Sequence, residues 1–171
     1  MVAAELFDDA TRIHLTSIKR HGVQIETDFA SDLRFVADCH NTLQILVNLV
    51  INALHAVKSC PPLQRRIELR TLRHENWVRF EVRDHGVGIT ADNMTRVFQH
   101  GFTTREGGHG FGLHSGALAA KRMGGSIVAS SEGTGQGTTF KLELPCHSTT
   151  TLPFKTKPPI PHSPSTQRPH E

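Results

Sequence analysis

Apolar residues recur at helical spacing in two long stretches of the chain, residues 3–21 and 39–59. The first stretch stops at Gly22, a residue type that commonly ends helices, and the second is followed by Pro61 and Pro62, which cannot continue one. Each stretch also has a polar side, so both are predicted to be amphipathic helices that bury one face. A short helix is predicted over residues 91–98 and a further long one over residues 111–123.

Other stretches alternate apolar and polar residues, as half-buried strands do. VQIETDFA, residues 23–30, alternates in this way, and so do RRIELRTLRH and WVRFEVRD on either side of a polar turn at residues 74–76. The last two stretches are therefore predicted to form a hairpin. Further along the chain, SIVASSE and TTFKLEL, on either side of GTGQG, are predicted to be a closing pair of strands.

The composition changes after Cys146. Residues 147–171 are rich in Pro, Ser and Thr and contain few apolar side chains. Such a segment cannot bury enough apolar surface to offset the entropy cost of ordering, so a disordered Pro-rich tail is predicted. The residues before it are numerous enough for one domain with its own core.

Charge and cysteine usage limit the classes of partner and compartment. Nineteen Lys and Arg stand against sixteen Asp and Glu, for a net charge of +3, and the basic residues are scattered, so no nucleic-acid partner is expected. Cys39, Cys60 and Cys146 form no C-x-x-C pair and are odd in number, which fits a reducing compartment. No signal-peptide pattern and no apolar run near the roughly 20 residues that span a bilayer is visible. A cytoplasmic location is expected, and membrane anchoring of a longer parent protein is left open.

The stretch GHGFGLHSGALAAKRMGG places Gly108, Gly110 and Gly112 directly before a predicted helix. The first turn of a helix exposes unpaired N–H groups and a partial positive charge, so it attracts phosphate where the backbone can approach closely. Glycine permits that approach. A glycine-rich surface turn explains the spacing equally well when it is taken alone.

The segment DHGVGI places Asp84 at the end of an apolar strand, before Gly86 and Gly88. A fixed carboxylate there can accept a hydrogen bond from the amino group of a flat ligand, while the glycines make space for its ring. A strand-end turn capped by the aspartate is the alternative.

The segment NLVINA places Asn48 and Asn52 four residues apart, and hence on one face of the predicted helix. Buried amides need hydrogen-bond partners. They either cross-link neighbouring backbone or form a polar wall that faces phosphates and Mg²⁺, a cation that prefers oxygen ligands.

In this order the segments resemble the ATP-binding catalytic domain of bacterial sensor histidine kinases, in the superfamily shared with gyrase, heat-shock chaperone and mismatch-repair ATPases. NLVINALHA is similar to the N box of this family, DHGVGI to its first glycine box and VFQHGFTTR to its F box. GHGFGLH is similar to the second glycine box and GTGQGTTFKLELP to the final one. Together they run from about residue 33 to residue 145.

The resemblance implies an α+β fold of the Bergerat type, a two-layer α/β sandwich. A mixed sheet of about five strands would be covered on one face by three helices: the helix of Asn48, the short helix at 91–98 and the helix at 111–123. It also implies that residues 1–21 are the end of a dimerisation helix and a linker, that 22–146 are the ATP-binding catalytic domain, and that 147–171 are the tail.

ATP and Mg²⁺ are the ligands that the resemblance implies. Asn52 would hold Mg²⁺ through its side-chain oxygen, and Asn48 would lie one turn earlier at the phosphate side. Asp84 would accept the adenine amino hydrogen, helped through water by Thr138 or Thr139. Phe98 and Phe102 would anchor the two ends of a mobile lid over residues 99–110, from which Arg105 would reach the phosphates. The catalytic set would be Asn48, Asn52 and Arg105. The remaining nucleotide contacts would be His55, Gly86, Gly88, Ile89, Thr103, Thr104, Gly108, Gly110, Phe111, Gly112 and Leu113.

The residue type at position 48 distinguishes ATP hydrolysis from phosphoryl transfer. ATPases of this superfamily typically carry a glutamate there to prepare water, and an amide is a poor general base, so phosphoryl transfer to a supplied nucleophile is favoured over hydrolysis. The predicted activity is that of a histidine kinase, which transfers the γ-phosphate to a histidine on a dimerisation segment. No H-E-x-x-N-P motif occurs in this chain, and His14 has no acidic residue after it and no Pro, so it is predicted to be a surface histidine.

The implied partners are ATP, the histidine-bearing dimerisation domain of the same parent kinase and a downstream response regulator. The parent would be a homodimer, whereas this chain could be a monomer. Two alternatives are kept: a regulatory module that binds nucleotide without productive transfer, and an ATPase or serine kinase of the same fold. The lid model also predicts that Gly110→Val obstructs phosphate binding and leaves the fold intact.

Overall fold

The computed structural model describes residues 1–31, 33–104, 108 and 110–146. Its helices are α1 (Ala3–Ile13), α2 (Leu15–His21), α3 (Cys39–Lys58), α4 (Ala91–Met94) and α5 (Gly112–Arg122), with a 3-10 turn at Pro62–Gln64. Its strands are β1 (Gln24–Phe29), β2 (Arg66–His74), β3 (Trp77–Asp84), β4 (Ser126–Ser130) and β5 (Thr138–Pro145). The predicted tail, residues 147–171, lies outside the described residues.

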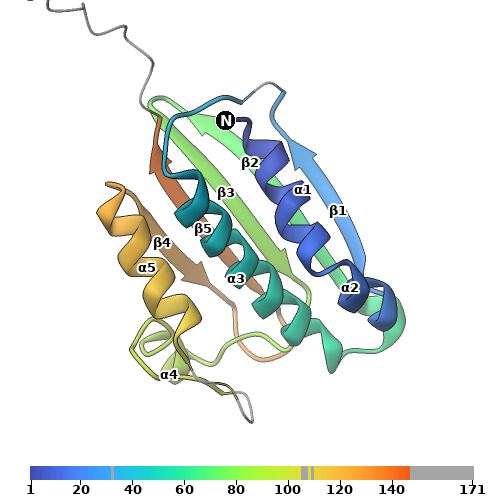
Figure 1. The fold of residues 1–171 in the computed structure, drawn as a ribbon. Helices are drawn as coiled ribbons and strands as arrows, with labels where there is room; N and C mark the ends of the chain where they lie inside the picture. Colours follow the sequence, from blue (N-terminus) through green and yellow to red (C-terminus); the bar gives the residue numbers. More distant parts are fainter. Residues whose placement is uncertain (32, 105–107, 109, 147–171) are drawn as a thin grey trace, which may run out of the picture.

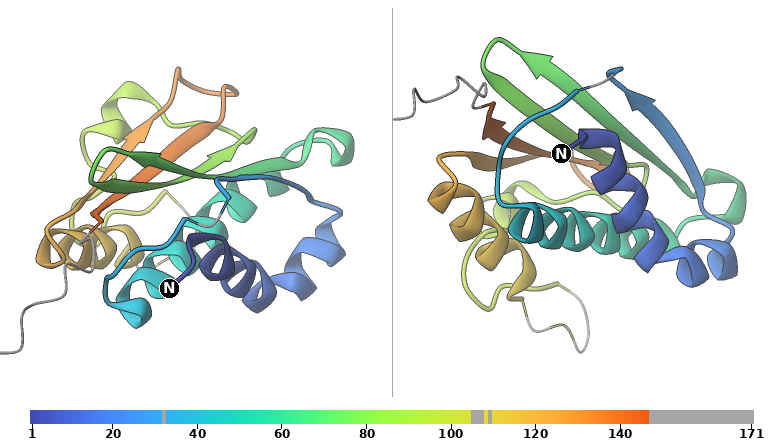
Figure 2. Two further views of the ribbon diagram at one scale, coloured as in Figure 1. Left: turned by 90° about the horizontal axis from the view of Figure 1, so that it is seen from above. Right: turned by 45° about the horizontal axis from the view of Figure 1, so that its top comes forward.

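One mixed sheet forms the first layer of the fold, with the strand order β1-β2-β3-β5-β4 (Figure 1). Strands β1 and β2 are parallel, and the other three neighbouring pairs are antiparallel. Helices α1, α3 and α5 form the second layer on one face, as Figure 2 shows. The predicted two-layer α/β sandwich is therefore confirmed.

The alternating pattern of the strands sorts their side chains between the two faces. Val78, Phe80 and Val82 on β3 are fully buried against the helices. Charged residues occupy the alternate positions and lie on the uncovered face, which we call the outer face. The hairpin of β2 and β3 turns at residues 75 and 76, as its sequence predicts, with Glu75 in the left-handed region at φ 53°.

Helix α3 is the longest helix and lies in the centre of the helical layer (Figure 1). Asp38 caps its first turn, because its Oδ1 accepts a hydrogen bond of 3.0 Å from the backbone N–H of Asn41. Its buried face continues to Val57, close to the predicted end. Among the described residues, no helix combines the length and apolar character needed to cross a bilayer.

The single helix predicted over residues 3–21 is wrong, because the chain forms two helices that break at His14. His14 has φ −102° and ψ 8°, which is not helical, and its Nε2 lies 3.3 Å from the carbonyl oxygen of Val47 on α3. Helix α2 ends at Gly22 as predicted, in the left-handed conformation with φ 60°. The break changes the direction of the chain before it enters β1.

Helix α1 belongs to the same hydrophobic core as the sheet and α3. Phe7 is fully buried, and its ring centroid lies 5.5 Å from that of Phe80 on β3 and 5.7 Å from that of Phe29 on β1. Val2 also pairs with Arg34 in an isolated β-bridge. Residues 3–13 thus pack as part of the domain, and their continuation from an upstream dimerisation helix stays a prediction.

The helix predicted over residues 91–98 is shorter than expected. Only Ala91–Met94 are helical, and the chain then tightens into turns, with the N–H of Arg96 bonded to the carbonyl oxygen of Asn93 at 3.0 Å. The third long helix over the sheet is therefore α1, and not the short helix that the resemblance implied.

Candidate functional site

Asp84 ends β3 and points into the helical layer, where only 2% of its surface is exposed. Its Oδ1 accepts a hydrogen bond of 2.9 Å from the backbone N–H of Gly86. Burial raises the pKa of this carboxyl from 3.8 to about 6, although hydrogen bonds from the backbone of Gly86 and Thr138 act in the opposite direction. The site thus contains a carboxylate that has few water contacts and retains capacity to accept hydrogen bonds.

Gly86 and Gly88 are required by close backbone packing. A Cβ at position 86 would lie 2.5 Å from the carbonyl carbon of Ala56 on α3, and the next residue, Val87, donates its N–H to Ala56 O at 3.2 Å. Gly88 has φ 70°, and a Cβ there would overlap the carbonyl oxygen of Gly133. The turn after Asp84 is therefore held directly against helix α3 and against the loop between β4 and β5.

Ser131 holds that loop to the turn, and no motif in the sequence pointed to it. Its Oγ donates to the carbonyl oxygen of Gly137 at 2.6 Å and accepts from the N–H of Ile89 at 3.1 Å. The N–H of Gly137 bonds in turn to Gly86 O at 3.2 Å. Hydrogen bonds thus connect the first glycine segment, which follows Asp84, to the final one.

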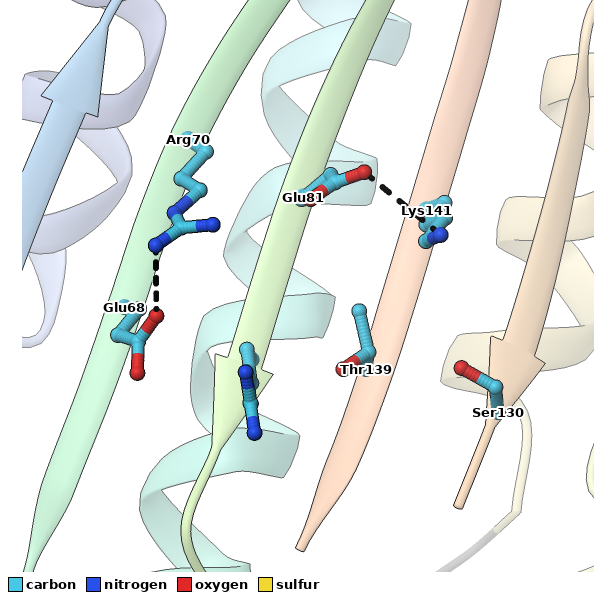
Figure 3. A pocket seen from close by; sticks show the side chains of 7 residues that line it. Glu68, Arg70, Glu81, Ser130, Thr139 and Lys141 are labelled. Atoms are coloured by element: carbon cyan, nitrogen blue, oxygen red, sulfur yellow. Dashed lines mark ion pairs between the residues drawn. The ribbon is translucent and has the colours of Figure 1, made fainter. Parts of the chain in front are cut away.

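Thr138 and Thr139 lie on opposite faces of the sheet. Thr138 pairs with Asp84 across the strands and is buried, with 4% exposed. Thr139 lines a hollow of about 180 Å³ on the outer face, together with Ser130 and charged residues of the neighbouring strands (Figure 3). Of the two threonines left open by the sequence, only Thr138 is brought together with Asp84.

Asn48 and Asn52 lie half-buried on α3, as does His55 one turn further along. The Nδ2 of Asn48 lies 3.5 Å from the carbonyl oxygen of Gly112, so the α3 amides and the start of α5 are adjacent. The first N–H groups of an α-helix have no partner within it, and Phe111 at the cap position of α5 carries no polar side-chain atom. The N-terminal end of α5 can therefore bind an anion.

The residues of this site suit an Mg²⁺ ion that is coordinated mainly by phosphate oxygens and water. Among the described residues, no group of three or more His, Cys, Asp or Glu could hold a metal ion. The amide oxygen of Asn52 is a single hard donor, and Mg²⁺ commonly keeps waters and phosphate oxygens as its other ligands. The residues present fit a metal that arrives with its phosphate.

The two ends of the predicted lid are packed against each other. Gly110, at φ 69°, lies against the backbone of Gly101 and Phe102, and a Cβ at position 110 would come within 2.6 Å of Phe102 O. The expectation that Gly110→Val leaves the fold intact is therefore wrong, since the side chain would force these backbones apart. Thr103 is half-buried, Thr104 is exposed and Gly108 is half-buried, whereas Arg105 lies outside the described residues.

Side-chain contacts that the motifs did not indicate hold the residues on either side of the lid. The guanidinium of Arg96 lies 4.7 Å from the centre of the Phe102 ring. The ring Nδ1 of His114 on α5 lies 3.0 Å from the carbonyl oxygen of Phe98, and because a carbonyl only accepts, Nδ1 carries the proton. The ring of His100 lies 5.1 Å from that of His114. Partly buried Leu113 and Phe98 pack against the core beside them.

Comparison with known proteins gives one family. Residues 38–148 match the family model described as "Histidine kinase-, DNA gyrase B-, and HSP90-like ATPase". The sensor kinase CckA of Brucella abortus (strain 2308) is 34% identical over 148 residues, which cover 78% of this chain but only 16% of that protein. This chain therefore spans a small part of the length of that relative.

Two solved structures have the same fold. The catalytic domain of the histidine kinase ThkA aligns with a TM-score of 0.74 at 24% identity, over 85% of this chain and 93% of that one. Full-length ShkA, solved in complex with AMPPNP, aligns with a TM-score of 0.72 at 27% identity, over 83% of this chain and 29% of that one.

Proposed function

Because the chain belongs to the family of histidine kinase-, DNA gyrase B- and HSP90-like ATPases, we propose that it binds MgATP and serves as the catalytic domain of a sensor histidine kinase. The nucleotide would lie between α3, the turn that follows β3 and the start of α5. The observation that carries the proposal is the buried carboxyl of Asp84, which faces the helical layer above a turn that admits only glycine at position 86.

Asp84 would bind the adenine amino group as a hydrogen-bond acceptor. A buried acceptor left without a donor is costly, so a base that presents a carbonyl in place of the amino group is disfavoured. Gly86, Gly88 and Ile89 would line the base, and Thr138 would reach it through water. ShkA, which has the same fold, was solved in complex with AMPPNP, and this supports nucleotide binding by the chain.

Asn48, Asn52 and the first turn of α5 would bind the triphosphate. Asn52 would offer its Oδ1 to Mg²⁺, which when bound supplies charge neutralisation to the phosphate oxygens. The N–H groups of Gly112 and Leu113 would donate to the phosphates from the positive end of the helix. Arg105 would add a positive charge from the lid, and His55 would lie further along the same wall.

The residue at position 48 favours transfer over hydrolysis. The amide of Asn48 has no proton-accepting strength near neutral pH, so the chain provides no base there to prepare water for attack. The γ-phosphate would pass instead to an imidazole on a separate dimerisation segment, and then to a response regulator. The parent protein would be a homodimer that brings this segment to the domain.

Calorimetric titration with AMPPNP, with and without Mg²⁺, tests nucleotide binding. We expect saturable binding that Mg²⁺ strengthens and that Asp84→Asn weakens, because the amide can donate where an acceptor is needed. Asp92→Asn is the matched control, since Asp92 lies exposed on the nearby α4 and should not alter affinity. No binding by the unaltered chain would contradict the proposal.

The kinase activity needs a second experiment, in which a histidine-bearing dimerisation domain is added to the chain with ATP. Acid-labile phosphate on that domain is the expected result. Binding without transfer would favour a regulatory module, and steady phosphate release abolished by Asn52→Ala would favour an ATPase.

A further inference from the structure

Glu68 is a buried carboxylate on the outer face of the sheet, opposite to the layer that contains the proposed nucleotide site. It lies on β2 with 8% of its surface exposed. It forms an ion pair with Arg70, marked by a dashed line in Figure 3, in which its Oε2 lies 3.2 Å from the guanidinium. Its Oε1 lies 2.6 Å from the ring Nε2 of His85. The hydrogen bond with His85 is the main cause that lowers the pKa of Glu68, so this residue is an ionised acceptor.

His85 is the residue between Asp84 and Gly86. The hydrogen bond from Gly86 N–H to Asp84 Oδ1 closes a turn whose central residue is His85. The orientation of the Asp84 carboxylate and the path of the Gly86 backbone therefore both depend on the backbone angles at position 85.

Three groups outside the turn hold His85 in place. Its N–H donates to the carbonyl oxygen of Arg66 at 3.1 Å, and its carbonyl oxygen accepts from the thiol of Cys60 at 3.7 Å. The ring Nε2 lies 2.6 Å from Glu68 Oε1 and 3.2 Å from the guanidinium Nη2 of Arg66. The contact with Glu68 is the shorter one, and because a carboxylate only accepts, Nε2 carries the proton and donates it to Glu68. A charge-assisted bond between partly buried groups is stronger than a neutral one, so the ring contact is the strongest of the three.

We propose that Glu68 and His85 are a pair of positioning residues for the nucleotide base. From the outer face they fix the turn on which Asp84 presents its carboxylate to adenine, and so determine how strongly adenine contributes to binding. The inference rests on the proposed nucleotide function and deepens it. Neither side chain would touch the nucleotide, because their contact lies across the sheet from it.

A purely structural role would give a different result. If the pair only stabilised β2 against β3, its loss would lower the melting temperature and weaken all nucleotide ligands alike. If it positions Asp84, its loss weakens ligands that carry adenine and leaves inorganic triphosphate unaffected, because triphosphate has no base for Asp84 to bind.

The experiment measures the affinities of AMPPNP and inorganic triphosphate, both with Mg²⁺, for the unaltered chain and its variants. For His85→Leu we expect the affinity for AMPPNP to fall about tenfold relative to that for triphosphate. Glu68→Gln should move the same ratio in the same direction by a smaller factor, since the amide oxygen still accepts but without charge. His85→Gln, which keeps a donor at similar reach, should restore most of the ratio.

Glu81→Gln is the matched control. Glu81 is also partly buried on the outer face and lies near the cations Arg79 and Lys141, but it does not contact the turn. Its substitution should leave the ratio unchanged. Should His85→Leu fail to fold, the ratio for Glu68→Gln decides between the two roles.

Ratios that stay within about twofold in Glu68→Gln and His85→Leu would overturn the positioning role. The proposed function would still hold if the unaltered chain bound AMPPNP and Asp84→Asn weakened it. Absence of binding by the unaltered chain would overturn both.

Discussion

The side chain of Asn48 on α3 touches the backbone of Gly112 at the start of α5, with Nδ2 3.5 Å from the carbonyl oxygen. A Cβ at position 112 would lie 3.5 Å from the Oδ1 of Asn48, which is ordinary van der Waals contact. Two segments separated by more than sixty residues thus meet where the phosphates are proposed to bind.

Gly110 and Gly112 should respond differently to alanine. Gly112→Ala adds a methyl group that fits beside Asn48 and favours the helix, so the melting temperature should hold or rise slightly. Gly110→Ala should lower the free energy of unfolding by about 1–3 kcal/mol, because φ is 69° and the Cβ would overlap the backbone of Gly101. Urea unfolding of both variants checks this, and equal stabilities would contradict the packing of the two lid ends.

Asp84 should reduce stability at neutral pH. Its pKa is raised from 3.8 to about 6, so its ionisation costs more in the folded chain than in the unfolded one. Its contribution is fully favourable below pH 3.8 and is lost as the pH rises to about 6. Asp84→Asn should therefore raise the free energy of unfolding at pH 7.5 by up to about 3 kcal/mol while weakening AMPPNP.

The measurement compares urea unfolding of the unaltered chain and Asp84→Asn across pH 4.5–7.5. The difference between the two should grow as the pH rises. The lowered pKa values of Asp38 and Glu68 give contributions of the opposite sign, lost as the pH falls, but these cancel in the difference. A difference independent of pH would show that the Asp84 carboxyl is not strained by burial.

The features of the site that could be predicted are relations between residues that are close in the sequence. Asn48 and Asn52 share a face because they are four residues apart on a helix, and Asp84 with Gly86 forms a turn within three residues. Such relations depend only on local geometry. The order of the segments then gave the family, which the match over residues 38–148 confirms.

The parts that could not be predicted depend on contacts between distant segments. Alternation along β5 places Thr138 on the same face as Phe140 and Leu142, but only the pairing of β3 with β5 shows that Thr138 stands opposite Asp84. The bond between Glu68 and His85 joins β2 to the residue that follows β3, seventeen positions further along the chain, so neither residue indicates the other. Helix α1 looked separate from the domain because nothing near it in sequence shows that Phe7 meets Phe80.

Asn52→Ala should remove the dependence of AMPPNP binding on Mg²⁺. The unaltered chain should bind AMPPNP at least about tenfold more tightly with Mg²⁺ than without it, and the variant should show little difference. Calorimetric titration in both conditions checks this. Gln44→Ala is the control, because Gln44 lies exposed on the same helix and offers its amide to solvent. Retained Mg²⁺ dependence in Asn52→Ala would assign the metal to other groups.

Phe7→Ala tests whether α1 belongs to the catalytic domain or only leads into it. Phe7 is fully buried between Phe29 and Phe80, so its loss should lower the free energy of unfolding by about 3–5 kcal/mol. Ile13→Ala is the control on the same helix, since Ile13 is 59% exposed and should cost less than about 0.5 kcal/mol. A small effect of Phe7→Ala would instead favour a domain that begins near residue 22, with residues 1–21 as a detachable linker. A large effect would show that residues 3–13 belong to the folded domain, because Phe7 joins α1 to β1 and β3 in one core.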